Sequence, residues 1–132
     1  MTEFKLLLVD DEKEFVNALA ERLELRRFAP RVAFDGESAL LMIREDPPAV
    51  IVLDLKMPGI DGVEVLRRVK RGWPAVQVII LTGHGSQRDA ETVCMLGAFA
   101  HLQKPVDIND LVGVLGRAYE RFRKESDNAH GA

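Results

Sequence analysis

Apolar residues follow two alternating patterns along the chain. Compact apolar runs predict strands, whereas apolar residues that recur every three or four positions predict helices. The expected strands cover residues 4–9, 31–34, 50–53, 76–81 and 98–102. A helical pattern follows each run, and the last one begins at Asp107 and carries Leu111, Leu115, Ala118 and Phe122 on one face. The chain is therefore predicted to alternate five strands with five helices.

This alternation indicates the fold class. Parallel strands must be joined by right-handed crossover helices, so we expect helices on both faces of the sheet. We predict an α/β domain of three layers, in which a doubly wound, flavodoxin-like sheet of five parallel strands has the order 2-1-3-4-5. The domain is expected over residues 1–124, and the charged residues 125–132 are expected to form a disordered tail.

Polar residues stand at the ends of four of the predicted strands. Asp10 and Asp11 follow the first strand, Asp54 follows the third, and Thr82 and Lys104 follow the fourth and fifth. The carboxyl ends of parallel strands lie at one edge of a sheet, and the winding reverses there between strands one and three. We therefore expect three carboxylates, a hydroxyl and an ammonium group to converge at this edge.

Three neighbouring carboxylates need a cation. Oxygen ligands without histidine or cysteine favour Mg²⁺, which retains some of its waters and prefers partners with phosphate oxygens. Asp54 beside Mg²⁺ is then a candidate phosphoryl acceptor, with Lys104 and Thr82 balancing the charge of the transferring group. Helix capping by Asp11 and Glu14 is the simpler interpretation, but it accounts for only one of the three carboxylates.

Composition narrows the partners and the compartment. The 132 residues are 47% hydrophobic and carry a net charge of −3, which suits one domain with its own core and argues against nucleic acid binding. A basic cluster, Arg67, Arg68, Lys70 and Arg71, is interpreted as a solvated helix face. The single cysteine, Cys94, is expected to be a packed thiol. Without a membrane-length apolar run or an apolar signal core, the chain is expected in the cytoplasm.

Four motifs together resemble the receiver domain of two-component response regulators over nearly the whole chain. They are Val9-Asp10-Asp11-Glu12, Asp54 with Met57-Pro58-Gly59 and Asp61-Gly62, Leu81-Thr82-Gly83-His84-Gly85, and Lys104-Pro105. The resemblance implies that Asp54 takes phosphate from a sensor kinase histidine. It implies that Asp11, Asp54 and the Lys56 carbonyl group hold Mg²⁺, with Asp10 acting partly through water. It also implies phosphoryl contacts from Thr82 and Lys104, and a cis Lys104-Pro105 peptide.

The resemblance further implies a switch on the face of the fourth helix, fifth strand and fifth helix, through which Thr82 reports phosphorylation to an output domain or a downstream protein. The chain departs from the family pattern at His101, where Tyr or Phe is frequent, and at Val106. His101 is interpreted either as part of the switch or as a surface residue on a peripheral strand. His84 and Lys56 occupy variable positions that tune phosphate loss in the family.

Other functions are weighed against this one. A flavodoxin-type cofactor module would need a phosphate loop after the first strand, where Asp10-Asp11-Glu12 would repel a flavin phosphate. A phosphatase with an aspartate nucleophile usually has a second Asp where this chain has Lys56. A receiver-like interaction module that does not turn over phosphate stays open. For Tyr119 and Phe122, a homodimer or signalling contact stays open beside packing on the core.

Overall fold

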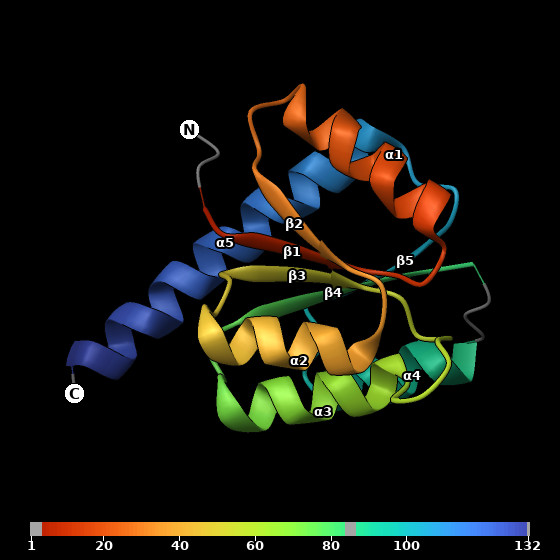
Figure 1. Cartoon of the computed structure of the whole chain (residues 1–132). Coiled ribbons are helices and arrows are strands. Elements are labelled where there is room, and N and C mark those ends of the chain that lie inside the picture. The colour runs from red at the N-terminus through yellow and green to blue at the C-terminus, as the bar shows by residue number, and fades with distance from the viewer. Residues whose placement is uncertain (1–3, 84–86, 132) are drawn as a thin grey trace.

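The computed structural model describes residues 4–83 and 87–131. Strands and helices alternate along the chain, as Figure 1 shows. In chain order the elements are β1 (Leu6–Val9), α1 (Lys13–Glu24), β2 (Pro30–Ala33), α2 (Gly36–Glu45), β3 (Val50–Leu53), α3 (Gly62–Gly72), β4 (Gln77–Thr82), α4 (Gln87–Met95), β5 (Ala100–Gln103) and α5 (Ile108–Gly131). Every predicted strand is therefore present, with its ends displaced by no more than two residues.

All five strands are parallel, and their order in the sheet is β2-β1-β3-β4-β5, as the sequence predicts. The register places the ends of three strands level with one another. Val9, the last residue of β1, pairs with Ala33 of β2 and with Leu53 of β3. The residues that follow Val9 and Leu53 consequently leave the sheet side by side, on adjacent strands.

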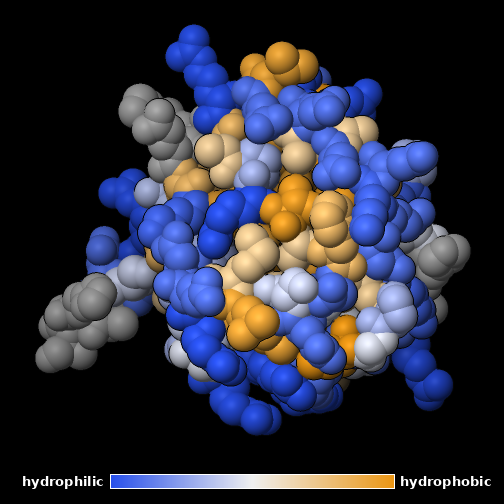
Figure 2. Space-filling model, in the orientation of Figure 1, coloured by the Kyte–Doolittle hydropathy of each residue, from blue (hydrophilic) through white to orange (hydrophobic). Residues whose placement is uncertain are grey.

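Different helices cover the two faces of the sheet (Figure 1). Successive residues of a strand point to opposite faces, so Leu7 and Val9 pack under α2, α3 and α4, whereas Leu6 and Leu8 pack under α1 and α5. Burial on both faces explains why β1 and β3 are uninterrupted apolar runs. The edge strand β2 is less buried, and Figure 2 shows a hydrophobic band across the middle of that side of the molecule.

Aspartates begin two helices as predicted, whereas the alternative interpretation of Asp11 as a helix cap is wrong. The Asp61 carboxylate accepts the backbone N–H of Glu64 at 3.0 Å, and Asp107 caps α5 in the same way. Asp11 does not cap α1, which begins at Lys13 with Glu12 as the N-cap residue. The preceding turn is instead closed by Asp10, whose Oδ1 accepts the backbone N–H of Glu12 at 2.9 Å.

The end of α5 overlaps the segment 125–132, and the division into a domain and a tail at residue 124 stays a prediction. The helix continues past residue 124 to Gly131, so the predicted boundary does not coincide with a helix end. Within this segment, Glu125 Oε2 accepts a hydrogen bond from the buried Gln77 side chain at 2.9 Å. An ion pair of 3.7 Å joins Glu125 to Arg121, one turn earlier. Among the described residues, no helix has both the length and the apolar character needed to cross a membrane.

Aromatic side chains attach the same helix to the start of the chain. The Tyr119 ring stacks on Phe4, with 4.4 Å between centroids, and Phe4 meets Phe28 edge to face at 5.7 Å. Phe122 packs against both hydrophobic cores. These contacts favour the interpretation in which Tyr119 and Phe122 pack on the domain.

Replacing Glu125 by alanine is expected to lower the free energy of unfolding by about 1 kcal/mol, because the buried Gln77 amide loses a hydrogen-bond acceptor. Urea denaturation measures this change, and amide hydrogen exchange should show faster exchange beyond Phe122. Glu120→Ala is the matched control, since Glu120 lies on the same helix and forms an exposed 3.6 Å ion pair with Arg123. Equal losses in the two variants would contradict the role given to Glu125.

Candidate functional site

Two buried carboxylates leave the sheet side by side. Asp10 follows β1 and Asp54 follows β3, and these residues are 4% and 5% exposed. The backbone N–H of Asp54 donates to the carbonyl oxygen of Val9 at 3.0 Å, and that of Asp10 donates to Ala33 at 3.1 Å. These bonds continue the strand ladders by one residue. Both side chains are therefore fixed at the carboxyl edge of the sheet.

The neighbouring strands bring the hydroxyl and the ammonium group to this edge. Thr82 is the last residue of β4, pairs with Gln103 of β5 and is fully buried. The backbone N–H of Lys104 donates to the Thr82 carbonyl oxygen at 3.0 Å. The Lys104-Pro105 peptide is cis, as the resemblance implies. The carboxyl ends of β1, β3, β4 and β5 thus supply one polar rim.

The ammonium group of Lys104 lies among three carboxylates. Its Nζ is 2.7 Å from Asp10 Oδ2 and 2.6 Å from Glu12 Oε1, but 3.9 Å from Asp54 Oδ2. Its other neighbour is the ring of Phe15, whose centroid is 4.3 Å away. Only 10% of the Lys104 side chain is exposed. Lys104 is therefore shared by all three carboxylates.

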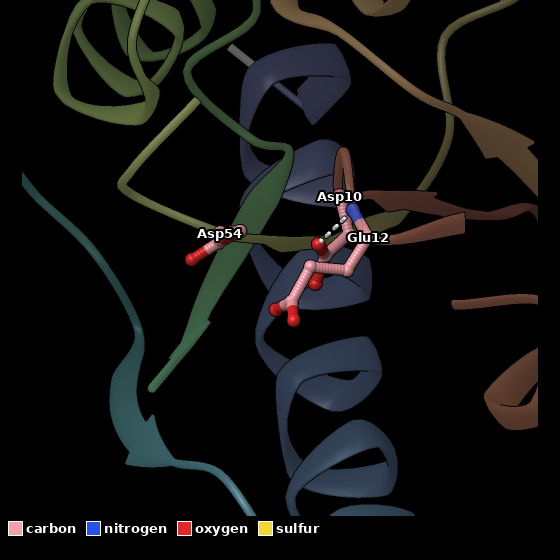
Figure 3. A group of neighbouring side chains, drawn as sticks. All are labelled: Asp10, Glu12 and Asp54. Atoms are coloured by element: carbon pink, nitrogen blue, oxygen red, sulfur yellow. Dashed lines mark hydrogen bonds between the residues drawn. The ribbon is translucent and has the colours of Figure 1, made fainter. Parts of the chain in front are cut away.

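The acidic side chains that meet here differ from the predicted set. Among the described residues, Asp10, Glu12 and Asp54 each offer an oxygen that lies within 4.8 Å of the others (Figure 3). The Asp11 carboxylate is not in this group, so its role as a metal ligand stays a prediction. Sequence reasoning missed Glu12, although it is the third acidic residue in the run after β1. Glu12 lies beside Lys104 because it precedes α1, which begins at Lys13.

The oxygen chemistry of this group suits a hard cation such as Mg²⁺. Three carboxylates face one ammonium group, so negative charge is in excess. Asp54 Oδ1 is buried, and among the described residues it has no hydrogen-bond partner. A buried acceptor without a partner is costly, and a cation would satisfy it. The residues present therefore fit a divalent metal ion.

The charges shift the pKa values of two groups. Burial raises the pKa of Asp10 above its ordinary 3.8, and the nearby Asp54 charge adds to this, although hydrogen bonds from Lys104 and the Glu12 backbone oppose it. Burial opposes the charge of Lys104, but hydrogen bonds with Asp10 and Glu12 and the carboxylate charges outweigh burial and raise the Lys104 pKa above 10.5. The edge thus favours protons on both Asp10 and Lys104.

Three positions are predicted to tune or switch the site, and the structure describes two of them. Lys56 is exposed, and its Nζ is 4.0 Å from Asp89 Oδ2 on α4. His101 lies within β5, paired with Ile80, and among the described residues its buried Nε2 has no hydrogen-bond partner. His84 lies outside the described residues. The roles of all three therefore stay predictions.

The expectation of a packed cysteine is wrong. Cys94 is exposed on α4, and its neighbour Val93 is the residue that faces the core. The helical phase of α4 turns the thiol outward.

A glycine allows α3 to begin against the backbone of Asp54. The N–H of Gly62 donates to the Leu55 carbonyl oxygen at 2.9 Å. A Cβ at position 62 would collide with the Asp54 carbonyl oxygen and would lie 2.7 Å from Leu55 Cα. Because the obstructing atoms are backbone, they cannot turn aside. The close approach that positions Asp54 therefore requires glycine here.

A doubly wound domain that presents a buried aspartate after β3, acidic residues after β1 and a lysine after β5 has the architecture of a receiver domain. A family model described as the response regulator receiver domain matches residues 6–115. The chain belongs to this family.

Individual relatives agree with the family match. An NtrX-like response regulator of Rickettsia conorii is 35% identical over 130 residues, which cover 97% of this chain and 27% of the relative. The crystal structure of the receiver domain of NtrX from Brucella abortus has a TM-score of 0.82 and 32% identity, and covers 87% of this chain and 98% of that one. A receiver domain structure from Clostridium thermocellum has a TM-score of 0.85 and 33% identity, and covers 90% and 96%. The chain thus spans about a quarter of the length of its NtrX-like relatives.

Gly62→Ala is expected to lower the free energy of unfolding by about 2 kcal/mol or more, because the added methyl group overpacks against backbone. Gly116→Ala is the matched control. A Cβ at position 116 meets nothing within 4 Å, so alanine should stabilise α5 by about 0.5–1 kcal/mol. Urea denaturation of both variants measures the difference, and a stabilised Gly62→Ala would contradict the packing described.

Asp10→Asn should remove a pH-dependent loss of stability in the metal-free protein. Because folding raises the pKa of Asp10, this group favours the folded state fully below 3.8, and the contribution is lost as pH rises through the raised value. The free energy of unfolding of Asp10→Asn, relative to wild type, should therefore increase as pH rises from 3.8 through the raised pKa of Asp10. Urea titrations in EDTA measure it.

Asp35→Asn is the control, because folding shifts the pKa of Asp35 in the opposite direction from that of Asp10. Hydrogen bonds from Ser38 lower the Asp35 pKa below 3.8, so its stabilising contribution is complete above 3.8 and is lost only as pH falls through the lowered value. The difference between Asp35→Asn and wild type should stay level over the range in which that of Asp10→Asn increases. A level difference for Asp10→Asn as well would refute the raised pKa.

Proposed function

We propose that this chain is a phosphoacceptor domain in which Asp54 takes a phosphoryl group from a histidine of a sensor kinase. The carrying observation is the setting of Asp54, a buried carboxylate with one unpartnered oxygen and another 3.9 Å from Lys104 Nζ. Aspartate carboxylates can act as nucleophiles that form an aspartyl-phosphate. Membership of the receiver family supports the same assignment.

The transfer exchanges one bond to phosphorus for another. An oxygen of Asp54 attacks the phosphorus and forms a P–O bond, while the P–N bond to the kinase imidazole breaks. The electron pair of that bond stays on the imidazole nitrogen, so Asp54 becomes an acyl phosphate. Lys104 is close enough to stabilise charge on the phosphoryl oxygens. The Thr82 hydroxyl is proposed to donate to them, because Thr82 ends the neighbouring strand.

Mg²⁺ is proposed as the cofactor of this transfer. Asp10, Asp11 and Asp54 with the Lys56 carbonyl group form the ligand set that the family implies, and Glu12 is a further carboxylate within reach. When bound, the ion supplies positive charge beside the transferring group. The unpartnered oxygen of Asp54 and the excess of carboxylates support its binding.

The output surface is proposed to be the face formed by α4, β5 and α5. Thr82 and His101 lie on the neighbouring strands β4 and β5, so a shift of Thr82 toward a phosphoryl group can reach this face. Met95, at the end of α4, is 88% exposed, which leaves an apolar side chain for a partner to cover. An output domain or a downstream protein is the proposed partner, and a second copy is the alternative. With a net charge of −3, direct nucleic acid binding is not proposed.

Incubation with acetyl phosphate and Mg²⁺ should add one phosphoryl group to the protein, with acetate as the leaving group, and Asp54→Asn should abolish the addition because the nucleophilic carboxylate is gone. Intact-protein mass spectrometry measures the mass shift. EDTA should also abolish it.

Asp61→Asn is the matched control for this experiment. Asparagine preserves the N-cap of α3, so this variant should be phosphorylated like wild type. Phosphorylation that persists in Asp54→Asn would disprove the acceptor assignment. Wild type that binds Mg²⁺ but never gains a phosphoryl group would instead support an interaction module that does not turn over phosphate.

Beryllofluoride, which mimics a phosphoryl group on Asp54, should shift the amide NMR signals of Thr82 and His101 as well as those of the acidic edge. Thr82→Ala should leave the shifts at Asp10 and Asp54 but reduce the shift at His101, because it removes the hydroxyl that is proposed to move toward the phosphoryl group. Shifts confined to the acidic edge in wild type would show that this face is not the output surface.

A further inference from the structure

The hydrogen bonds of Lys104 go to the end of β1. An ammonium group has three donors, and two of them reach Asp10 at 2.7 Å and Glu12 at 2.6 Å. The distance of 3.9 Å to Asp54 Oδ2 is beyond hydrogen-bond range. The lysine expected to serve the phosphoacceptor is therefore bonded to other carboxylates in this structure.

The two bonded carboxylates differ in how firmly they are held. Asp10 is buried, and its other oxygen accepts the Glu12 backbone N–H at 2.9 Å. The side chain of Glu12 is 63% exposed, so water reaches its carboxylate. Water can therefore replace Lys104 as the partner of Glu12, whereas the buried Asp10 carboxylate would lose its counterion without such a replacement. Glu12 is therefore the partner that Lys104 can release.

We propose that Glu12 is a positioning residue that competes with the phosphoryl group on Asp54 for the ammonium group of Lys104. This inference rests on the proposed phosphorylation of Asp54. As the phosphoryl group arrives, Lys104 turns toward its oxygens and gives up the hydrogen bond to Glu12, so that bond slows the transfer. The same carboxylate lies in the acidic group, where its charge strengthens cation binding.

The two effects have opposite signs in a single variant. Glu12→Gln keeps the size of the side chain but removes its charge. At saturating Mg²⁺, acetyl phosphate should phosphorylate this variant about two- to fivefold faster than wild type. The dissociation constant of the variant for Mg²⁺ should rise by a similar factor. Changes of this size are expected when a partly exposed ion pair is removed. A phosphate-affinity gel measures the rate, and calorimetry without phosphodonor measures Mg²⁺ binding. A role of Glu12 in folding alone would slow phosphorylation, if it changed the rate at all.

Glu14→Gln is the matched control. Glu14 is exposed on the first turn of α1 and lies outside the acidic group, so this variant changes the net charge equally without touching Lys104. It should keep wild-type phosphorylation and Mg²⁺ affinity. The side-chain NMR signal of Lys104 in the metal-free, unphosphorylated protein gives an independent readout. It should shift in Glu12→Gln and stay in place in Glu14→Gln.

The outcomes separate this inference from the proposed function. If wild type is phosphorylated and Glu12→Gln is no faster at saturating Mg²⁺, competition for Lys104 is overturned and the phosphoacceptor function stands. If wild type is never phosphorylated, the proposed function fails and the competition fails with it. A Lys104 signal that moves equally in Glu12→Gln and Glu14→Gln would also overturn the specific contact.

Discussion

The parallel register of β1 and β3 is the constraint on which the site depends. Because Val9 pairs with Leu53, the next residue on each strand is an aspartate, and the Asp54 N–H is bonded to the Val9 carbonyl oxygen. Two carboxylates are thereby buried at adjacent strand ends, where their charges disfavour one another. The fold compensates with Lys104, which the Thr82 carbonyl group fixes at the end of the next strand pair. The sheet thus creates the crowding of charge and also supplies its counterion.

Much of this arrangement could be predicted from the sequence, because buried parallel strands appear as apolar runs and polar residues punctuate their ends. The strand order, the convergence of Asp10, Asp54, Thr82 and Lys104, and the cap at Asp61 follow from these local signals. These signals predict which strands and helices form and in what order the strands pair. The side chains that meet at the edge depend on finer details.

Those details explain what the sequence did not predict. The participation of Glu12 depends on where α1 begins, and a difference of one or two residues there decides which acidic side chain faces Lys104. The hydrogen bond between Gln77 and Glu125 joins residues that are 48 positions apart in the chain. A charged segment favours disorder when it is considered alone, and such a distant contact is not visible in its local sequence.

The length of α5 has a mechanical consequence. The helix lies along β3 and β4, and Figure 1 shows its last turns projecting beyond the sheet. From Leu115, inside the core, to Gly131, the helix extends roughly 24 Å at 1.5 Å per residue. For a straight helix of this length, a tilt of about 5° about Leu115 moves the C-terminal end by roughly 2 Å. A small change of packing at the sheet would therefore become a much larger displacement at the end of the helix. A displacement of this size is comparable to the helix shifts that separate two states of an interface.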